Sequence, residues 1–227
     1  MCGRFTITFT PDDIREFFGL FEVPGFDLRY NVAPSQDVPA IRLEEDKRRL
    51  VFLRWGLIPF WSGDPGTWYR AINARSETVH KTPAFRAAFR KRRCIIPAGG
   101  FFEWLKKGKE KQPYYIRRKD GRPMAFAGLW EHWEGEDKGE SKTIESCTII
   151  TTVSNKLVGE LHNRMPVILE ARDFEPWLDP SKESPGELVS LLKPAPEEVL
   201  EMYPVSGYVN RPQNEGKECI EPAGGGG

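Results

Sequence analysis

Short segments rich in β-branched and aromatic residues recur along the chain, each bounded by glycine, proline or polar turn residues. Such segments are typical of β-strands. The predicted strands cover residues 51–60, 94–96, 113–118, 124–130 and 146–153. Because strands outnumber helices and do not alternate regularly with them, we expect a single-domain α+β fold. Its centre is a mixed, curved, barrel-like β-sheet with peripheral helices.

The clearest helix signal follows Thr10. Thr10 is a suitable N-cap, Pro11 takes the first helical position, and Ile14 and Phe18 recur at helical spacing. Gly19 is expected to end this helix. Further helices are predicted over 83–91 with Thr82 as N-cap, over 155–161 with Ser154 as N-cap, and near 186–192 and 196–202.

At 227 residues the chain is long enough to bury one core. We expect one domain over 1–220. The polar run 134–142 predicts a hairpin tip, and the segment "EPAGGGG" (221–227) predicts a flexible glycine-rich tail.

The composition, with 39% hydrophobic and 29% charged residues, is that of a globular protein. No apolar run approaches the ~18 residues of a membrane span, and no secretory leader is evident. We therefore expect no membrane partner and an intracellular location, cytoplasmic in a bacterium or nuclear in a eukaryote. The cysteines at 2, 94, 147 and 219 lack zinc-site spacing, so free thiols and no metal are expected. No nucleotide or zincin motif occurs, and no cofactor is predicted.

The formal net charge of zero conceals an uneven distribution. Residues 1–122 hold 24 Lys and Arg against 14 Asp and Glu, whereas residues 123–227 hold 9 against 19. This asymmetry favours an anionic partner on one face, although charges scattered over solvated surface would give the same totals.

Two ionisable residues are candidates for acid–base chemistry. Glu103 stands among aromatic residues in "FFEW", where desolvation would raise its pKa, but strand alternation also allows a solvated position. His162 follows a predicted short helix and precedes a strand, a common place for catalytic histidines. His80 and His132 lie in more ordinary polar surroundings.

Two basic segments are candidates for anion binding. Asn73 and Arg75 are two residues apart, so on an extended segment both point the same way and could hold a phosphate or sugar oxygen. The run 81–93 is basic, and Phe85 and Phe89 in it have helical spacing. Those rings are expected on the buried face of a surface helix, while its basic residues could border a DNA groove.

Cys2 follows the initiator methionine. Removal of Met1 would leave an α-amine and a thiol on one residue, and this pair can close an aldehyde into a five-membered thiazolidine.

In order and separation, six motifs together resemble the SOS-response-associated peptidase family, and the resemblance extends from Cys2 to about Val209. The motifs are "MCGRF", "RYNVAPSQ", "WGLIPFW", "INARSET", "CIIPAGGFFEW" and "HNRMPVIL". Membership implies a DNA-damage role, in which the N-terminal Cys captures the aldehyde of an abasic site in single-stranded DNA as a thiazolidine crosslink.

The resemblance also implies roles for individual residues, carried by these motifs. Cys2 would be the nucleophile, Glu103 the acid–base, and Asn73 with Arg75 would orient the site and bind a flanking phosphate. His162 and Arg164 would assist chemistry and bind DNA, with Arg4 as a further backbone contact. This chain has Phe60-Trp61-Ser62 where family members can carry two adjacent tryptophans, so the role of Trp61 as the aromatic DNA contact is less defined. A monomer is expected, and no replication-associated partner is specified.

Two other function classes stay open at the level of sequence. One is a thiol-dependent peptidase, or autopeptidase, that uses Cys2 and His162. The other is a non-catalytic single-stranded DNA-binding module, which would not need the Cys2 thiol.

Overall fold

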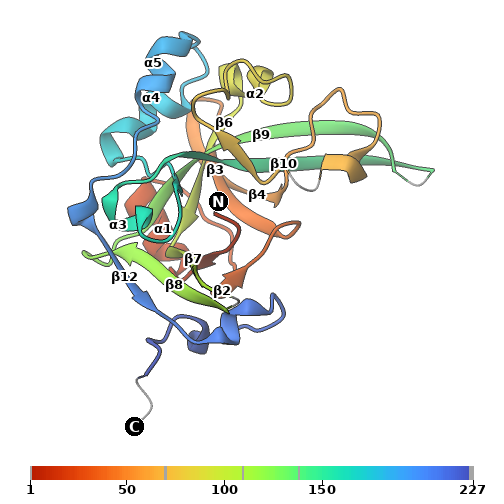
Figure 1. The fold of residues 1–227 in the computed structure, drawn as a ribbon. Coiled ribbons are helices and arrows are strands. Elements are labelled where there is room, and N and C mark those ends of the chain that lie inside the picture. The colour runs from red at the N-terminus through yellow and green to blue at the C-terminus, as the bar shows by residue number, and fades with distance from the viewer. Residues whose placement is uncertain (1, 69–70, 109, 138, 225–227) are drawn as a thin grey trace.

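The computed structural model describes residues 2–68, 71–108, 110–137 and 139–224. Its strands form two sheets (Figure 1). The five-stranded sheet has the order β12 (Leu200–Pro204), β8 (Glu110–Arg118), β7 (Gly100–Lys107), β1 (Phe5–Ile7) and β2 (Arg29–Val32). The seven-stranded sheet has the order β11 (Arg164–Pro166), β10 (Glu140–Val153), β4 (Lys47–Trp55), β3 (Asp37–Glu44), β6 (Arg93–Ala98) and β9 (Met124–Asp137). The remaining strand, β5 (Asn73–Arg75), pairs with β10 in parallel.

The second sheet closes on itself, because β9 pairs with β10 as well as with β6. Strands β10, β4, β3, β6 and β9 thus form a barrel. Parallel and antiparallel pairings occur together, and the helices lie outside the barrel (Figure 1). The predicted single-domain α+β fold on a mixed, barrel-like sheet is therefore confirmed.

The described helices are short and peripheral. They are α1 (Pro11–Phe18), α2 (Arg86–Lys91), α3 (Lys156–Gly159), α4 (Phe174–Leu178) and α5 (Pro185–Ser190), with 3-10 turns η1 (Pro65–Trp68), η2 (Ala171–Asp173), η3 (Glu197–Val199), η4 (Gly207–Asn210) and η5 (Lys217–Cys219). Helix α1 confirms its prediction. Thr10 Oγ1 accepts from the Asp13 amide, and Gly19 ends the helix at φ 64°.

Several predicted boundaries were wrong. Strand β4 ends at Trp55 and does not continue to residue 60, because Gly56 turns the chain at φ 133°. Helix α2 begins at Arg86, and Thr82 does not cap it, since the Thr82 hydroxyl donates back to the Thr78 carbonyl in the preceding turn. The N-cap of α3 is Asn155 and not Ser154, because the Asn155 side chain accepts from the Val158 amide.

Two further predictions, both for the second half of the chain, differ from the structure. The predicted helix 196–202 is the short turn η3 followed by β12, because residues from Leu200 onward pair with β8. The predicted hairpin tip 134–142 is mostly strand, since β9 and β10 stay paired out to Asp137 and Glu140. In the expected tail, Pro222 forms a bridge with Val205, and residues 225–227 lie outside the described residues.

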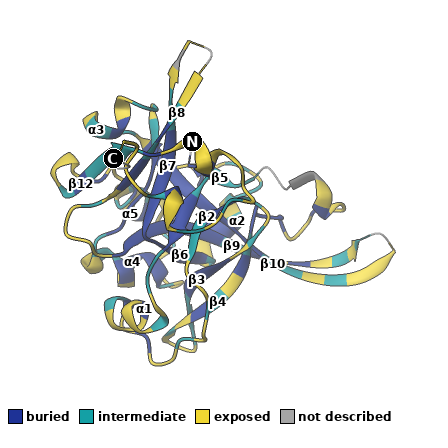
Figure 2. Cartoon of the chain, turned by 90° about the horizontal axis from the view of Figure 1, so that it is seen from below, coloured by how far each residue is buried: buried dark blue, intermediate teal, exposed yellow. Residues whose placement is uncertain are grey.

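The principal core lies inside the barrel and against the inner face of the five-stranded sheet. Phe5 packs edge-on against Trp55 at 5.1 Å between ring centroids, and against Phe126 at 6.1 Å. A second cluster lies beneath the helices and includes Phe89 and Trp177. Figure 2 shows buried strands in the body of the molecule, while the ends of the β7–β8 and β9–β10 hairpins project and are largely exposed.

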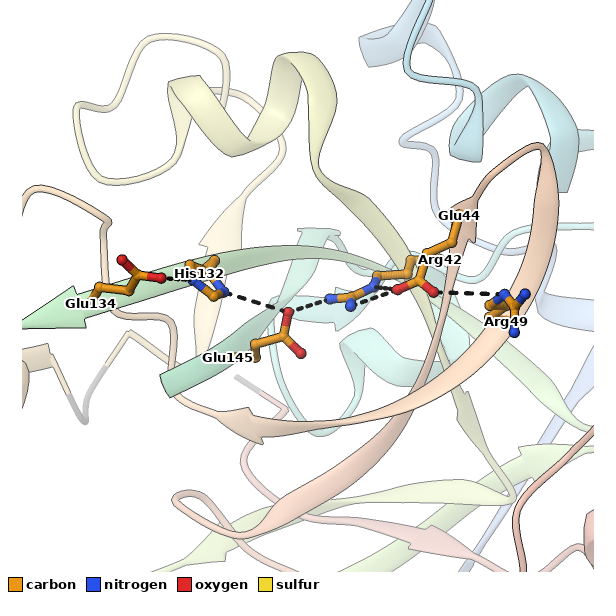
Figure 3. Close-up of polar contacts among 6 residues, drawn as sticks. All are labelled: Arg42, Glu44, Arg49, His132, Glu134 and Glu145. Carbon is orange, nitrogen blue, oxygen red and sulfur yellow. Dashed lines mark hydrogen bonds and ion pairs between the residues drawn. The ribbon is translucent and has the colours of Figure 1, made fainter. Parts of the chain in front are cut away.

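A network of charged side chains lies at one end of the barrel (Figure 3). Arg42 continues the inward-facing row of β3 and pairs with Glu44 and Glu145 at 2.6 and 2.8 Å. Its guanidinium also lies 4.2 Å from the ring centroid of Trp130. His132 lies between Glu134 and Glu145, at 2.8 and 3.8 Å, and these carboxylates raise the pKa of His132.

Candidate active site

Cys2 lies three residues before the start of β1 and is fully buried. Its carbonyl oxygen accepts a hydrogen bond from Asn73 Nδ2 at 2.8 Å. Asn73 is fixed in turn by the parallel pairing of β5 with β10, in which it lies opposite Ile149. The Asn73 Oδ1 atom is buried and accepts no hydrogen bond from the described residues, so its capacity as an acceptor is unused.

Glu103 lies on β7, whose pairing with β1 brings it beside the N-terminal segment. Strand alternation places Glu103 on one face of β7 and Phe102 and Trp104 on the other. The face that carries Glu103 is turned inward, however, and Glu103 is only 4% exposed. The solvated alternative was therefore wrong. Burial raises the pKa of Glu103, while the positive charge at the chain's amino terminus and His162 lower it in part.

The Cys2 thiol is desolvated in the same place. Burial raises the pKa of the Cys2 thiol well above its usual range, and the neighbouring Glu103 carboxylate raises it further. The thiolate is the reactive form of cysteine, and this environment disfavours it. A reaction of Cys2 therefore needs a nearby base that accepts the thiol proton.

His162 follows α3, and its backbone amide donates to the Val158 carbonyl at 3.0 Å. Its Nδ1 atom accepts from the Arg164 amide at 3.0 Å. The proton of a neutral His162 ring is therefore on Nε2, which can donate to a substrate oxygen. His162 and Glu103 line a common pocket of about 420 Å³.

The two arginines assigned to DNA lie on strands that flank β10. Arg75 on β5 is paired with Thr151 of β10, and Arg164 on β11 is paired with Val153 of β10. Arg75 is exposed, and its side chain forms no hydrogen bond or ion pair with the described residues. Arg164, by contrast, is bound at 2.7 and 3.0 Å by the two carboxylate oxygens of Glu77 and also donates to the Thr151 carbonyl.

Arg4 is directed away from Glu103, toward the outer face of the five-stranded sheet. Its guanidinium lies 5.9 Å from the Trp104 ring centroid and donates to Asn31 Oδ1 at 2.6 Å and to the Val209 carbonyl at 2.9 Å. These contacts fasten the C-terminal segment to β1 and β2. The geometry thus gives Arg4 a structural role, and a DNA contact by Arg4 stays a prediction without support from its position.

Trp61 is exposed, as is its neighbour Phe60. Both line a hollow of about 330 Å³ whose other side is formed by Pro83, Arg86 and Ala87. Helix α2 buries Phe89, as predicted, and leaves Arg86 and Arg90 exposed.

Four further residues line the pocket of Glu103 and His162, the reaction pocket, and were not identified from the sequence. These are Trp104, Lys106, Lys111 and Asn210. Lys106 and Lys111 are directly opposite in the β7–β8 hairpin and form no ion pair within the described part of the chain. Like charges in this arrangement repel each other. Strand alternation places Lys106 on the face of Trp104 and not on that of Glu103, so it does not indicate Lys106 as a pocket residue. Only the hairpin register pairs Lys106 with Lys111.

The other candidates for chemistry are separate from this pocket. His80 lies near Phe89, and His132 belongs to the barrel end. The four cysteines are free thiols. In the described ranges no three or more His, Cys, Asp or Glu side chains are grouped as metal ligands. None of the described helices is long and apolar enough to cross a membrane.

Comparison with known proteins identifies the family of the chain. Residues 1–212 match the model of the family described as "SOS response associated peptidase (SRAP)", and the chain belongs to this family. It is 44% identical over 225 residues to the abasic site processing protein YoqW of Bacillus subtilis, with 97% of this chain and 99% of the relative covered. It is 31% identical to the abasic site processing protein HMCES of Xenopus tropicalis, with 97% and 78% covered.

Solved structures agree as well. A crystal structure of a protein from Bacteroides thetaiotaomicron superposes with a TM-score of 0.86 at 30% identity, covering 98% of this chain and all of the other. The fold is therefore that of the family.

Proposed function

We propose that the protein captures abasic sites in single-stranded DNA through a thiazolidine formed by Cys2 after removal of Met1. The observation that carries the proposal is that Cys2, Asn73, Glu103 and His162 come together from four separate segments. Asn73 binds the Cys2 carbonyl, the Glu103 carboxylate is close enough to raise the pKa of the Cys2 thiol, and Glu103 and His162 line one pocket. The names of the relatives, which are abasic site processing proteins, support the same substrate.

The reaction balances with the loss of one water. The Cys2 α-amine attacks the aldehyde carbon of the ring-opened sugar and gives a carbinolamine, which loses its hydroxyl as water to form an iminium. The Cys2 sulfur then adds to the same carbon, and the thiol proton leaves. An α-amine has a reference pKa of about 7.7–8.0, so part of it is neutral at pH 7, unlike a lysine amine near ~10.4.

Glu103 is suited to both proton transfers. Because its pKa is raised, it can hold a proton for the departing hydroxyl, and as a carboxylate it can then accept the thiol proton. This second transfer removes the need for a free thiolate, which the burial of Cys2 disfavours. His162 Nε2–H would donate to the sugar oxygen as the deoxyribose ring opens, and Asn73 Oδ1 would accept from a substrate hydroxyl.

The surface around the pocket supports a single strand as the substrate. Arg75, Lys106 and Lys111 supply unpaired positive charge for phosphates, and Trp61 offers an exposed ring for stacking on a base. Stacked bases in a duplex would hinder access to the buried Cys2. Arg164 would contribute after sharing or releasing Glu77. We propose that the monomer is sufficient, because the pocket is formed by one chain.

A thiol peptidase is less well supported. Such an enzyme needs a cysteine whose pKa is lowered by a neighbouring cation, whereas burial and Glu103 raise the pKa of Cys2. A non-catalytic module would give no reason to bury Glu103 beside Cys2 at the cost of desolvation.

The test is intact mass spectrometry of the protein, alone and after incubation with a single-stranded abasic oligonucleotide. The expected result is a free protein that lacks Met1 and an adduct whose mass is the sum of protein and DNA less one water. An oligonucleotide whose abasic aldehyde has been reduced to an alcohol is the control. An adduct that forms equally with the reduced oligonucleotide, or no adduct at all, would refute the proposal.

A further inference from the structure

Residues 56–62, in the connection between β4 and η1, form a loop that presents two aromatic rings to solvent. Phe60 is 54% exposed and Trp61 is 51% exposed. Loops that carry binding residues are usually mobile, and ordering such a loop on binding costs affinity. The contacts of this loop show that much of the ordering is already present.

Both flanks of the loop are bonded to one face of the β9–β10 ribbon. Trp133 Nε1 donates to the Ser62 carbonyl at 2.7 Å, and Ser146 Oγ accepts from the Ile58 amide at 2.9 Å. Trp133 is buried, and its ring packs against Gly135. A larger residue at position 135 would clash, because its Cβ would lie 2.5 Å from the Trp133 ring.

The centre of the loop is held by an ion pair on the same face. Arg92 Nε donates to Glu131 Oε1 at 3.1 Å, and Arg92 Nη2 donates to the same oxygen. The Glu131 side chain is only 2% exposed. The Arg92 guanidinium lies 5.9 Å from the ring centroid of Phe60. Burial raises the pKa of the Glu131 carboxyl, and hydrogen bonds from Arg92 and from the Phe60 backbone lower it in part. Glu131 is therefore in contact with the loop itself.

We infer that Glu131 is a positioning residue for DNA binding, which acts through Arg92 to hold Phe60 and Trp61 ready for stacking. The inference rests on the proposed single-stranded DNA substrate. Glu131 touches neither Cys2 nor Glu103 in the reaction pocket, so its effect should fall on affinity and not on the chemical step. Preorganising the rings lowers the entropy that binding would otherwise cost.

The ribbon provides a matched control on its other face. Glu145 pairs with Arg42 at 2.8 Å (Figure 3), and its strand neighbour Ser146 is paired opposite Glu131. Both carboxylates therefore belong to arginine pairs at the same level of the ribbon. Only Glu131 faces the aromatic loop, whereas Glu145 faces the barrel end.

The experiment compares Glu131→Gln with Glu145→Gln in the full chain. Fluorescence anisotropy gives the affinity for an undamaged, dye-labelled single strand, and single-turnover crosslinking to an abasic strand gives the half-saturating concentration and the maximum rate. We expect Glu131→Gln to weaken binding by about tenfold at an unchanged maximum rate, and Glu145→Gln to change neither.

A double-mutant cycle separates positioning from general loss of structure. In a Phe60→Ala/Trp61→Ala background, Glu131→Gln should cause no further loss of affinity, because the rings through which it acts are gone. Additive losses, equal losses in both carboxylate variants, or no loss in Glu131→Gln would overturn the inference. If Glu131→Gln does not fold, Ser146→Ala, which removes the hydroxyl that accepts from the Ile58 amide, is expected to show the same weakening, and unchanged affinity would overturn the inference.

The anisotropy measurement needs no crosslink. Failure of every protein to crosslink, with the affinity difference intact, would therefore count against the proposed function alone. Failure of wild type to bind single-stranded DNA would overturn both.

Discussion

The buried pair Cys2 and Glu103 and the exposed cations near it differ in burial and in charge pairing, although the proposal places both in one site. Cys2 and Glu103 are buried, and neighbouring strands fix them from several sides. Arg75, Lys106 and Lys111 are exposed, and no carboxylate among the described residues neutralises them. Removing pocket groups from water shifts their pKa values, whereas exposed cations keep their charge and act through the field. The buried pair should therefore control the rate of crosslinking, and the exposed cations should control the affinity for DNA.

The sharpest way to break this division is to remove the sulfur. In Cys2→Ala with Met1 removed, the α-amine can still form an imine with the abasic aldehyde, but no ring can close. The stable adduct should be lost completely, and a reversible adduct should appear that only borohydride traps. Denaturing gels with and without reductant measure both.

A version of the wild type with its terminus blocked is the matched control, since it keeps the thiol and lacks the amine. It should form neither adduct. If the blocked protein crosslinks as well as the free one, the thiol acts alone and the assignment of the amine is wrong.

The second prediction concerns the proton carried by Glu103. Glu103→Gln keeps the shape and removes the acid–base, so the single-turnover rate should fall by roughly 10²-fold or more, while affinity for undamaged DNA is unchanged. The same variant should be more stable than wild type at pH 7 by about 1 kcal/mol. A carboxyl whose pKa is raised by folding destabilises the protein as pH rises above the ordinary carboxyl range, and glutamine removes that cost.

Rapid-quench kinetics and denaturant unfolding test the two halves of this prediction. Below the ordinary carboxyl range, where Glu103 is protonated in both folded and unfolded chains, the stability difference should disappear. A variant that crosslinks at the wild-type rate would show that Glu103 transfers no essential proton.

How far the sequence predicts this site depends on the range of the interactions involved. Local patterns predicted helix α1 with its Thr10 cap and most of the strands, because propensity and turn residues act over a few positions. They also drew attention to Glu103 and His162 one by one. The burial of Glu103 could not be predicted, since it depends on which face of β7 turns toward the barrel.

Long-range register determines what local patterns leave open. Asn73 meets Cys2 only because β5 pairs in parallel with β10. The motif of Arg4 does not indicate its hydrogen bonds to Asn31 and Val209, and the DNA contact assigned to Arg4 stays a prediction. The choice of Asn155 over Ser154 as cap of α3 was a shift of a single residue, which local preference does not resolve.

The third prediction addresses the surface. Lys106→Gln/Lys111→Gln removes two cations at the edge of the pocket, so the slope of log affinity against log salt should become shallower by about 1.4 if both meet phosphates of a single strand. The maximum crosslinking rate should not change. Anisotropy titrations at several salt concentrations measure the slope, with Lys119→Gln/Lys193→Gln, two exposed lysines outside the pocket lining, as a charge-matched control. Equal slopes in both double variants would mean that the lysine pair contributes only to the general field.

The smallest expected effect uses the same variant in the absence of DNA. Lys106 and Lys111 are cross-strand neighbours at an exposed hairpin end, where like charges directly opposite each other cost roughly 0.2–1 kcal/mol. Lys106→Gln/Lys111→Gln should therefore raise the free energy of unfolding by a few tenths of a kcal/mol at low salt. Because ions screen exposed charges, the gain should vanish at high salt. Denaturant unfolding at the two salt concentrations measures this difference. A stabilised hairpin that binds DNA less tightly would show that this repulsion is maintained for phosphate binding, whereas an unchanged or lower stability would show that the two ammonium groups stay far enough apart not to repel.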